Sequence, residues 1–352
     1  MKVLILAGGT GGHVYPALSV AKEFSRSKHS IFWIGKKLSL ESELSKKESF
    51  NFTSLETRGF KGKNIIGKIV SLIYLEINLL KSIFIIKKIK PDMVFSTGGH
   101  VTLAPALASY LLSIPIFIHE QNSVPGLVNK ILNRLSKLTF EAFPGSFNKS
   151  PKIHTVGNPV RLEIIKSPPP KPTIKEHFNI LILGGSQGSR QLNEIVLKAF
   201  KNKMIPSHWH IVHQIGDLDR SSIVEAYSKH DCSYEVIPYI TNIGEAYHQS
   251  DLVIGRSGAM TISEICCSSK PSILLPLPWA TDNHQYLNAK FLEDKNASIV
   301  LESTLDSADS LFTLLNDLEK DHNARHSMSV NAFNTFPTSS CNKIIEIINE
   351  SF

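Results

Sequence analysis

The chain has 352 residues, of which 42% are apolar and 20% are charged. This length predicts about two domains, and the apolar fraction excludes an intrinsically disordered chain. With 20 glycines, 18 prolines and no repeat period, collagen, coiled-coil and low-complexity architectures are excluded as well.

Short apolar runs alternate with helical stretches along the whole chain. In the first half we expect strands at Lys2–Leu6, Ser30–Ile34, Met93–Ser96, Ile114–His119 and Leu138–Ala142. In the second half we expect them at Asn179–Leu183, Trp209–Gln214, Ser233–Ile237, Leu252–Gly255 and Ser272–Leu275. Parallel sheets with helices on both faces produce this alternation.

Both halves open with a strand, a glycine-rich turn and a helix start, VLILAGGTGGH at 3–13 and NILILGGSQGS at 179–189. Pro159 and the PPPKP run at 168–172 mark the join. We therefore expect an α/β protein with two Rossmann-type, doubly wound parallel-sheet domains that face each other across a cleft. The domains are expected at 1–160 and 161–337, with a C-terminal helix at about 338–352 that packs back on the first. This organisation resembles the GT-B glycosyltransferase fold.

Charge is divided unevenly between the halves. Residues 1–160 contain 21 Lys and Arg against 9 Asp and Glu, a formal charge of +12, whereas residues 161–352 contain 17 against 22, a charge of −5. A basic first half indicates an anionic partner, and nucleic acid is the least favoured one because no nucleic-acid-binding motif is present. A lysine-rich surface without a partner is the alternative.

The cysteines and the first residues both favour a cytosolic protein. Cys232, Cys266, Cys267 and Cys341 show no C-x-x-C spacing, so neither a zinc site nor a disulfide framework is expected. The start, MKVLILAGG, lacks the longer apolar run and the cleavage site of a signal peptide.

Residues 60–90 combine seven lysines and one glutamate with a very apolar middle. Lys68, Glu76 and Lys81 interrupt the apolar run, which is too short to span a bilayer. A helix in this stretch would place Ile69, Leu72, Ile73, Glu76, Leu79, Leu80 and Ile83 on one mainly apolar face. This face either packs on the sheet or rests, with its lysine rim, on an anionic membrane surface.

The two glycine turns are candidate phosphate sites. GGTGGH (Gly8–His13) lacks the Lys-Ser/Thr ending of a P-loop, and His13 stands where a dinucleotide fingerprint has its last glycine. Small residues at a helix N-terminus still favour anions, and GGSQGS (Gly184–Ser189) repeats the arrangement with the hydroxyl of Ser186. The alternative is a pair of purely structural turns.

Three further motifs carry polar groups at strand ends. GRSGAMTISE (Gly255–Glu264) places Glu264 on a helix, where its carboxylate can accept two hydrogen bonds from a ribose diol. HEQNSVPG (His119–Gly126) gathers groups that suit a sugar, and GNPVR (Gly157–Arg161) ends in an arginine that can reach a phosphate. A solvated glutamate and a surface arginine are the alternatives.

In this order, GGTGGH, HEQN..PG, GNPVR, GGSQG, RSGA.T..E and D.HQ..NA resemble the MurG family. The resemblance runs from Lys2 to about Ala297. It implies an inverting transferase that moves GlcNAc from UDP-GlcNAc to the 4-hydroxyl of undecaprenyl-pyrophosphoryl-MurNAc-pentapeptide. It also implies a donor site in the second domain, an acceptor site in the first, and peripheral attachment to the cytoplasmic face of the cytoplasmic (inner) membrane.

On matching positions the resemblance implies roles for individual residues. Glu264 would bind the ribose, Ile240 the uracil through its backbone, and Gln285 the GlcNAc hydroxyls. Ser186 and Arg161 would lie at the diphosphate. The remaining implied contacts are Ala259, Met260, Thr261, Ile262 and Ser263 around the nucleotide, and Thr10, Gly11, Gly12 and Asn122 over the donor sugar.

Attack by the acceptor hydroxyl requires a base that takes its proton. His13 is our first candidate, because an imidazole titrates near neutral pH, and Glu120 is the second. No DxD-like motif follows a strand, so we expect neither a metal nor a cofactor. A role for His13 in orienting the loop or a phosphate is the alternative.

One motif departs from the family pattern, which usually reads GGYVSGP where this chain has GGHVTLA (Gly98–Ala104). We hypothesise that His100 takes over the hydrogen bond of the missing tyrosine. Two other functions remain open: a UDP-N-acetylglucosamine 2-epimerase-like enzyme and a non-catalytic UDP-sugar-binding protein. Protein partners are not predicted.

Overall fold

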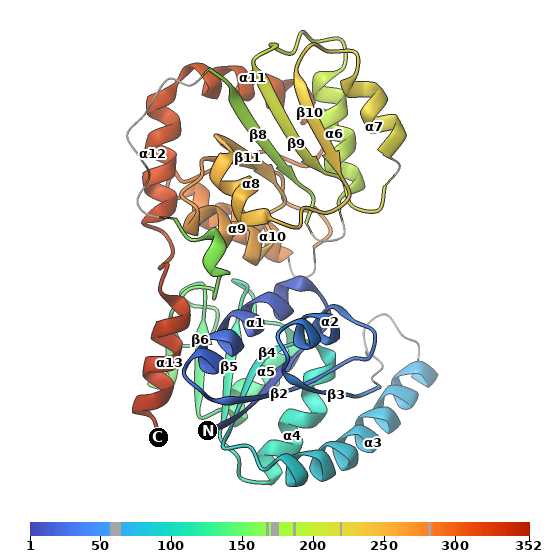
Figure 1. Cartoon of the computed structure of the whole chain (residues 1–352), viewed down its shortest axis with the longest axis vertical. Helices are drawn as coiled ribbons and strands as arrows, with labels where there is room; N and C mark the ends of the chain where they lie inside the picture. Colours follow the sequence, from blue (N-terminus) through green and yellow to red (C-terminus); the bar gives the residue numbers. More distant parts are fainter. Residues whose placement is uncertain (57–64, 167–168, 170–175, 186–187, 219, 281–282) are drawn as a thin grey trace. The chain divides into compact units, whose positions relative to one another are not determined.

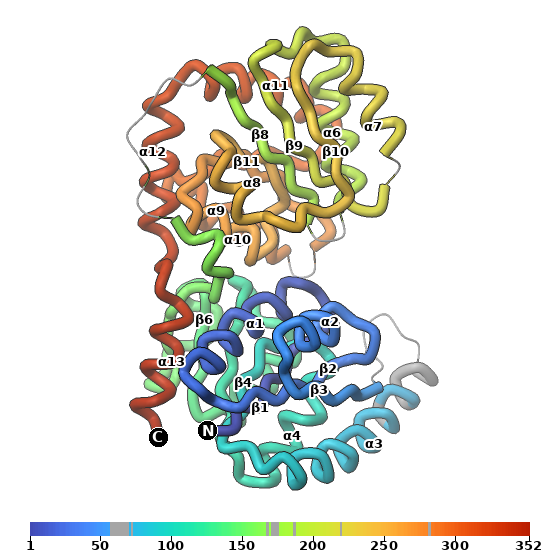
Figure 2. Tube along the Cα trace, viewed as in Figure 1, coloured from blue at the N-terminus to red at the C-terminus, as the bar shows by residue number. Residues whose placement is uncertain are grey.

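The protein consists of two compact units, one formed by Met1–Arg161 with Ser339–Phe352 and the other by Leu162–Thr338. The structure is a computed structural model of the full chain. It describes every residue except 57–64, 167–168, 170–175, 186–187, 219 and 281–282. Figures 1 and 2 show the path of the chain within each unit.

The first unit is built on a parallel sheet of seven strands in the order β3-β2-β1-β4-β5-β6-β7. The strands are β1 (Lys2–Ala7), β2 (Ser30–Gly35), β3 (Asn51–Ser54), β4 (Met93–Gly98), β5 (Ile116–Glu120), β6 (Leu138–Glu141) and β7 (Ile153–Thr155). The helical elements are α1 (Gly11–Arg26), α2 (Leu40–Lys47), α3 (Ile65–Ile89), η1 (His100–Thr102), α4 (Leu103–Leu111), α5 (Leu127–Leu135) and α13 (Ser340–Glu350).

Alternate residues of β1 enter two cores on opposite faces of this sheet, as the period of a strand requires. Val3 and Ile5 pack with α1, whereas Leu4 and Leu6 pack on the face that α3, α4 and α5 cover. Figure 2 shows α13, from the end of the chain, beside α1, from its beginning. Ile344 and Ile348 of α13 are buried in the α1 core, which fixes the chain end to the first unit.

The second unit contains a parallel sheet of six strands in the order β10-β9-β8-β11-β12-β13. The strands are β8 (Phe178–Leu183), β9 (Trp209–Gln214), β10 (Ser233–Ile237), β11 (Leu252–Gly255), β12 (Ser272–Leu274) and β13 (Ile299–Val300). The helical elements are η2 (Leu162–Ile164), α6 (Arg190–Phe200), α7 (Arg220–Tyr227), α8 (Ile243–Gln249), α9 (Ala259–Cys267), α10 (His284–Glu293), α11 (Ser307–Lys320) and α12 (His322–Phe333).

Both sheets have the doubly wound strand order, which confirms the predicted fold class. The chain leaves β1 toward β2 and returns to β4 on the other side, and β8 stands in the same relation to β9 and β11. Ligands of open α/β sheets bind outside the carboxyl ends of the strands at such switch points. The two glycine turns, GGTGGH and GGSQGS, follow β1 and β8, and the motifs GGHVTLA and GRSGAMTISE place a glycine turn at the end of β4 and of β11.

All ten predicted strands are present, and the structure adds β3, β7 and β13, which the sequence analysis missed. These three are edge strands of two to four residues, and many of their side chains are half-buried or exposed. An edge strand is covered on fewer sides than a central one, so its sequence lacks a continuous apolar run.

Candidate functional site

In the first unit, the glycine turns after β1 and β4 lie against each other. A Cβ on Gly99 would come within 2.1 Å of the carbonyl oxygen of Gly8, and the φ of Gly99 is +97°. Only glycine allows this approach. The contact places the predicted residues Thr10, Gly11 and Gly12, at the start of α1, beside the second turn.

The imidazole of His13 is held in one orientation by two carbonyl oxygens. Its Nδ1 lies 2.8 Å from the backbone oxygen of Thr97 and 2.8 Å from Oε1 of Gln121. Since the backbone oxygen can only accept, Nδ1 carries the proton and donates, and the lone pair of the neutral ring is on Nε2. This is the tautomer that a general base needs.

The hydrogen bonds continue from His13 into the interior. Nε2 of Gln121 donates to Nδ1 of His119 at 3.0 Å, and Nε2 of His119 donates to the backbone oxygen of Gly157 at 2.9 Å. Complete burial lowers the pKa of His119 to about 4, against a smaller upward effect of the hydrogen bond to Gly157. His119 is therefore neutral at pH 7, and the donors run in one direction from His13 to Gly157.

Glu120 is buried, and both of its carboxylate oxygens accept hydrogen bonds. Oε1 accepts from the backbone N–H of Asn122 at 3.0 Å and from its Nδ2 at 3.2 Å. Oε2 accepts from the N–H of Gly126 at 3.1 Å and from Nδ2 of Asn129 at 2.9 Å. The carboxylate thus fixes the loop from 121 to 126 and orients the predicted residue Asn122.

Arg161 ends the main segment of the first unit. Its guanidinium lies over the ring of Tyr15 on α1, 4.4 Å from the ring centre. The nearby Asn158 donates from Nδ2 to the backbone oxygen of Gln121 at 3.1 Å, which ties this segment to the His13 network. The cation–π contact holds the positive charge beside the first turns of α1.

In the second unit, the glycine turn after β8 is anchored at Gly188. A Cβ on this residue would come within 2.4 Å of the backbone oxygen of Ile215. The turn ends at Ser189, the N-cap of α6. Ser186, predicted to bind the diphosphate, lies outside the described residues.

Arg256 joins this turn to the rest of the carboxyl edge. Its Nε donates to Oγ of Ser189 at 2.9 Å, and its Nη2 donates to Oε1 of Gln191 at 3.0 Å. Its Nη1 donates to the backbone oxygen of Leu275 at 2.8 Å and to Oγ of Ser303 at 2.6 Å. Burial lowers the pKa of Arg256 to about 10, so the guanidinium is still charged at pH 7. All the acceptors in these bonds are neutral, so the full positive charge lies beside a turn that suits an anion.

The predicted nucleotide residues lie on α9, which begins directly after the turn at Gly258. Ala259, Ile262, Ser263 and Glu264 are buried, whereas Met260 and Thr261 are half-buried. Ile262 and Ser263 are completely buried, and Oγ of Ser263 donates to the backbone oxygen of Ala259. The hydroxyl of Tyr247 donates to Oε2 of Glu264 at 3.2 Å, which fixes this carboxylate.

Two more predicted residues lie near this edge. The backbone N–H of Ile240 donates to Oε1 of Gln214 at 3.1 Å, so this N–H is used within the protein. Gln285, in the first turn of α10, accepts at Oε1 from the N–H of Leu277 at 3.0 Å. The hydroxyl of Ser257 donates to the backbone oxygen of Gln285 at 2.8 Å, so α10 is tied to the turn after β11.

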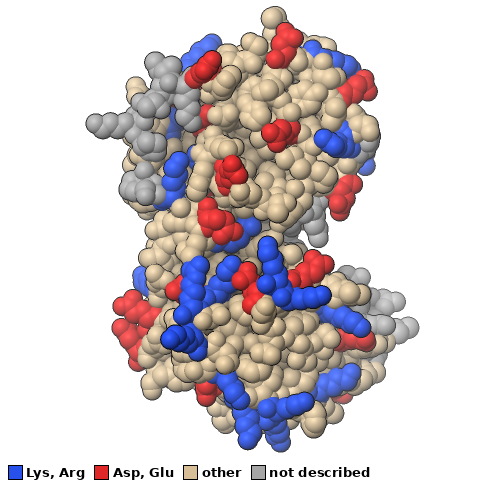
Figure 3. Space-filling view, viewed as in Figure 1, with Lys and Arg blue, Asp and Glu red and all other residues tan. Residues whose placement is uncertain are grey.

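Helix α3 exposes an apolar stripe, which we call the α3 stripe: Ile73, Ile77, Leu80 and Phe84 are 50%, 44%, 69% and 74% exposed. Figure 3 shows Lys and Arg side chains gathered at the end of the first unit where α3 and α4 lie. Exposed lysines follow the stripe at Lys81, Lys87, Lys88 and Lys90. No helix in the described part of the chain has the length and apolar character that a bilayer crossing needs.

The prediction for this helix needs a correction. Of the residues assigned to its single apolar face, Ile73, Glu76 and Leu80 are exposed, whereas Leu79 and Ile83 pack against the core of the first unit. The buried side of α3 includes the polar residues Ser71, Asn78 and Ser82. The helix thus has two partly apolar faces, and hydropathy alone placed residues of both on a single face. The side chains of Ile69 and Leu72 lie outside the described part of the structure.

The sequence analysis missed Thr97, His119, Gln121 and Arg256 as members of the site. His119 and Gln121 stand in a motif that the analysis singled out, but their hydrogen bonds depend on a fold that brings β4 and β5 together with α1. Arg256 stood in a motif that was interpreted through its glutamate. An arginine directly after an apolar strand is the signal that would have identified it.

Comparisons with known proteins cover nearly the whole chain. Residues 3–140 match the Glycosyltransferase family 28 N-terminal domain, and residues 179–344 match the Glycosyltransferase family 28 C-terminal domain. A protein of Coxiella burnetii (strain Dugway 5J108-111) is 35% identical over 334 residues, which are 94% of this chain and 93% of the relative. A protein of Vesicomyosocius okutanii is 36% identical over 347 residues, 99% of this chain and 97% of the relative.

Both relatives carry the name UDP-N-acetylglucosamine--N-acetylmuramyl-(pentapeptide) pyrophosphoryl-undecaprenol N-acetylglucosamine transferase. Among solved structures, MurG of Acinetobacter baumannii is similar with a TM-score of 0.81 and 30% identity, over 99% of both chains. The similarity therefore extends through both units.

Proposed function

Because this chain belongs to the MurG family, within glycosyltransferase family 28, we propose that it transfers GlcNAc from UDP-GlcNAc to the 4-hydroxyl of undecaprenyl-pyrophosphoryl-MurNAc-pentapeptide. The reaction converts one lipid-linked peptidoglycan precursor into the next. The observation that carries this proposal is the identity of about 35% along nearly the full length to relatives named for this reaction. The relatives' names do not describe an epimerase or a non-catalytic binding protein.

We assign the donor to the second unit. The glycine turn after β8 and the charge of Arg256 support a diphosphate at the β8–β11 switch point. Glu264, fixed by Tyr247, would accept from the ribose hydroxyls, and Gln285 would meet the sugar. Because the N–H of Ile240 already donates to Gln214, its carbonyl oxygen would accept from the uracil. Ile262 and Ser263 would contact the nucleotide only through their backbone, since their side chains are completely buried.

We assign the acceptor diphosphate to the paired glycine turns of the first unit, beside the start of α1. His13 would act as the general base. Its Nδ1–H is engaged by Thr97 and Gln121, which leaves the Nε2 lone pair to take the proton of the 4-hydroxyl as this oxygen attacks the anomeric carbon. The carbon–oxygen bond to UDP would break on the opposite side. The positive charge of Arg256, and that of Arg161 as the family resemblance implies, would favour the leaving group.

We assign Glu120 a positioning role, because four hydrogen-bond donors already surround its carboxylate. It would hold Asn122 against the donor sugar. His100 is exposed at the start of η1, so the acceptor can reach its side chain. If replacing His100 by Phe leaves the acceptor KM unchanged, this contact is absent.

The test of the function is transfer of radiolabelled GlcNAc from UDP-GlcNAc to a short-chain analogue of the lipid acceptor. We expect product with the wild type, and a fall in kcat by a factor of about 10²–10⁴ in His13→Ala, with unchanged UDP affinity. Formation of UDP-ManNAc from the donor alone, without transfer, would establish the epimerase instead. Full activity of His13→Ala would refute the base assignment but leave the transferase standing.

We further propose that the protein attaches peripherally to the cytoplasmic face of the cytoplasmic membrane through the α3 stripe. Apolar side chains bordered by lysines are suited to an anionic bilayer. Ile73→Ser/Leu80→Ser/Phe84→Ser should abolish sedimentation with vesicles that contain phosphatidylglycerol, with UDP affinity retained. Leu79 is left unchanged in this test, because it packs against the core of the first unit. Unchanged sedimentation would exclude the stripe from the membrane contact.

A further inference from the structure

The second unit contains a pocket at the edge of its sheet opposite to the glycine turns. Its lining comes from the last turns of α6 and α7, from the residues after them up to Ile205 and Asp231, and from Leu305 in the loop between β13 and α11. The segments after α6 and α7 precede β9 and β10, so they lie at the amino ends of these strands, whereas the glycine turns follow the carboxyl ends. The pocket is therefore separate from the proposed donor site.

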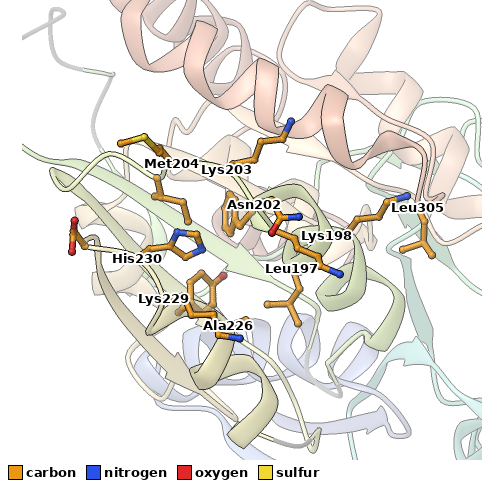
Figure 4. Close-up of a pocket in the computed structure, with 14 residues that line it drawn as sticks. Leu197, Lys198, Asn202, Lys203, Met204, Ala226, Lys229, His230 and Leu305 are labelled. Atoms are coloured by element: carbon orange, nitrogen blue, oxygen red, sulfur yellow. The ribbon is translucent and has the colours of Figure 1, made fainter.

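The pocket has an apolar wall and the size of a ligand site. Its volume is about 740 Å³, within the usual range for small-molecule pockets. Phe200 and Tyr227, which also line it, are only 2% and 1% exposed, so the accessible apolar atoms come from Leu197, Met204, Ala226 and Leu305. Figure 4 shows Met204 and Lys203 on one side of the pocket and Ala226 and Lys229 on the other. Met204 is 93% exposed, so its side chain is accessible from solvent.

The apolar wall is rigid because its aromatic rings are fixed from behind. The hydroxyl of Tyr227 hydrogen-bonds to Nδ1 of buried His213 at 3.0 Å, and its ring stacks on Tyr234 with 5.4 Å between the centres. With 1% of its surface exposed, Tyr227 therefore supports the pocket from the core, and the accessible apolar atoms come from the side chains around it.

The rim of the pocket is cationic, with four lysines and a single aspartate in the lining. Three of the lysines reach carboxylates outside the lining: Lys198 to Asp306 at 3.9 Å, Lys203 to Asp309 at 3.0 Å, and Lys229 to Glu225 at 3.1 Å. These carboxylates are 100%, 80% and 72% exposed, so solvent screens each pair and its contribution to stability is small. An incoming anion can therefore replace these carboxylates as the partner of the lysines at little cost in free energy.

We propose that this pocket binds a small amphipathic anion. The apolar body of the ligand lies against Leu197, Ala226 and Leu305, and its phosphate, sulfonate or carboxylate group lies among Lys198, Lys201 and Lys229. The proposal is independent of the transferase function, since no lining residue belongs to the donor or acceptor sites assigned above. It adds a second ligand site to the nucleotide-binding unit.

The test uses 1-anilinonaphthalene-8-sulfonate as the probe, titrated by fluorescence in the presence of saturating UDP. The variant Lys201→Glu/Lys229→Glu reverses two charges of the rim, and Lys149→Glu/Lys320→Glu makes the same change at exposed positions outside the lining. We expect the rim variant to raise the Kd by about tenfold and the control by less than about twofold. The uncharged probe N-phenyl-1-naphthylamine should bind both variants equally. Equal Kd values of the sulfonate for the two variants would overturn the proposal.

A second measurement locates the probe. The Met204→Cys thiol is labelled with an uncharged maleimide, with Lys320→Cys as the control and the wild type as the background of native cysteines. We expect the bound sulfonate probe, at saturating concentration, to slow labelling at position 204 at least about fivefold. Labelling at position 320 should keep its rate. Unchanged labelling at position 204 under saturating probe would show that the probe binds elsewhere and would refute the proposed site. Transfer activity of Lys201→Glu/Lys229→Glu should equal that of the wild type.

Discussion

Replacing Glu120 by Gln separates the two candidate bases. In the wild type, both carboxylate oxygens accept hydrogen bonds, from the N–H and Nδ2 of Asn122, the N–H of Gly126 and Nδ2 of Asn129. A glutamine offers one oxygen, and its NH₂ group would face two donors. Two hydrogen bonds to a charged acceptor are then lost, at about 1.5–3 kcal/mol each, so the free energy of unfolding should fall by about 3–6 kcal/mol.

Differential scanning calorimetry with bound UDP measures this loss. UDP stabilises the proposed donor unit and raises its transition temperature, so the unfolding of the first unit can be followed separately. A loss of 3 kcal/mol should lower the Tm of the first unit by at least about 6 °C. Glu350→Gln, the same chemical change at an exposed position of α13, should shift the Tm by less than about 2 °C. The acceptor KM of Glu120→Gln should rise, since the loop that carries Asn122 is no longer held.

A different outcome would refute the reasoning. If Glu120→Gln keeps the Tm of the wild type within about 2 °C and loses kcat by a factor of 10² or more, the carboxylate takes part in proton transfer. The positioning role would then be wrong, and the role of His13 as the base would fall with it.

Three further predictions follow from the same contacts. Gly99→Ala should destabilise the first unit by more than about 3 kcal/mol and abolish transfer, because the added Cβ meets Gly8 at a positive φ; Gly126→Ala, where a Cβ meets nothing within 4 Å, is the control in urea unfolding. Arg256→Lys should weaken UDP binding at least about tenfold in calorimetric titration, since one ammonium cannot reach Ser189, Gln191 and Ser303 together; an unchanged affinity would remove Arg256 from the donor site. The pKa of His119 is about 4 in the folded protein, below the ordinary value of 6.5 in the unfolded chain. As the pH falls below 6.5, the unfolded state takes up a proton before the folded state does, so the free energy of unfolding should fall by about 2 kcal/mol between pH 6.5 and about pH 5. A His119→Gln variant with the same pH dependence as the wild type would contradict this.

The buried parts of the fold were predictable from the sequence. Central parallel strands are covered on both faces, so β1, β4, β8 and β11 appear as continuous apolar runs, and glycine marks each of the turns behind them. Strand order follows because doubly wound sheets have few topologies. The edge strands β3, β7 and β13 were not predictable, because half-exposed strands of two to four residues leave little pattern.

The candidate site was predictable as a set of motifs but not as a set of contacts. His13, Glu120 and Glu264 could be named because their residue types and positions after strands point to particular chemistry. Their roles depend on partners from elsewhere in the chain, such as Thr97 for His13 and Tyr247 for Glu264. Such partners are far apart in sequence, and no local pattern records them.

The sequence by itself determined the family, the two doubly wound sheets and the positions of the glycine turns, because each rests on local periodicity, glycine placement or short motifs. Only the tertiary structure decided which nitrogen of His13 keeps a lone pair, which oxygens of Glu120 are occupied, and which face of α3 is exposed. The physical reason is that a hydrogen-bonding role or an exposed face depends on which groups meet in space. Sheet formation brings those groups together from segments that can be more than a hundred residues apart, as His13 and Gln121 show.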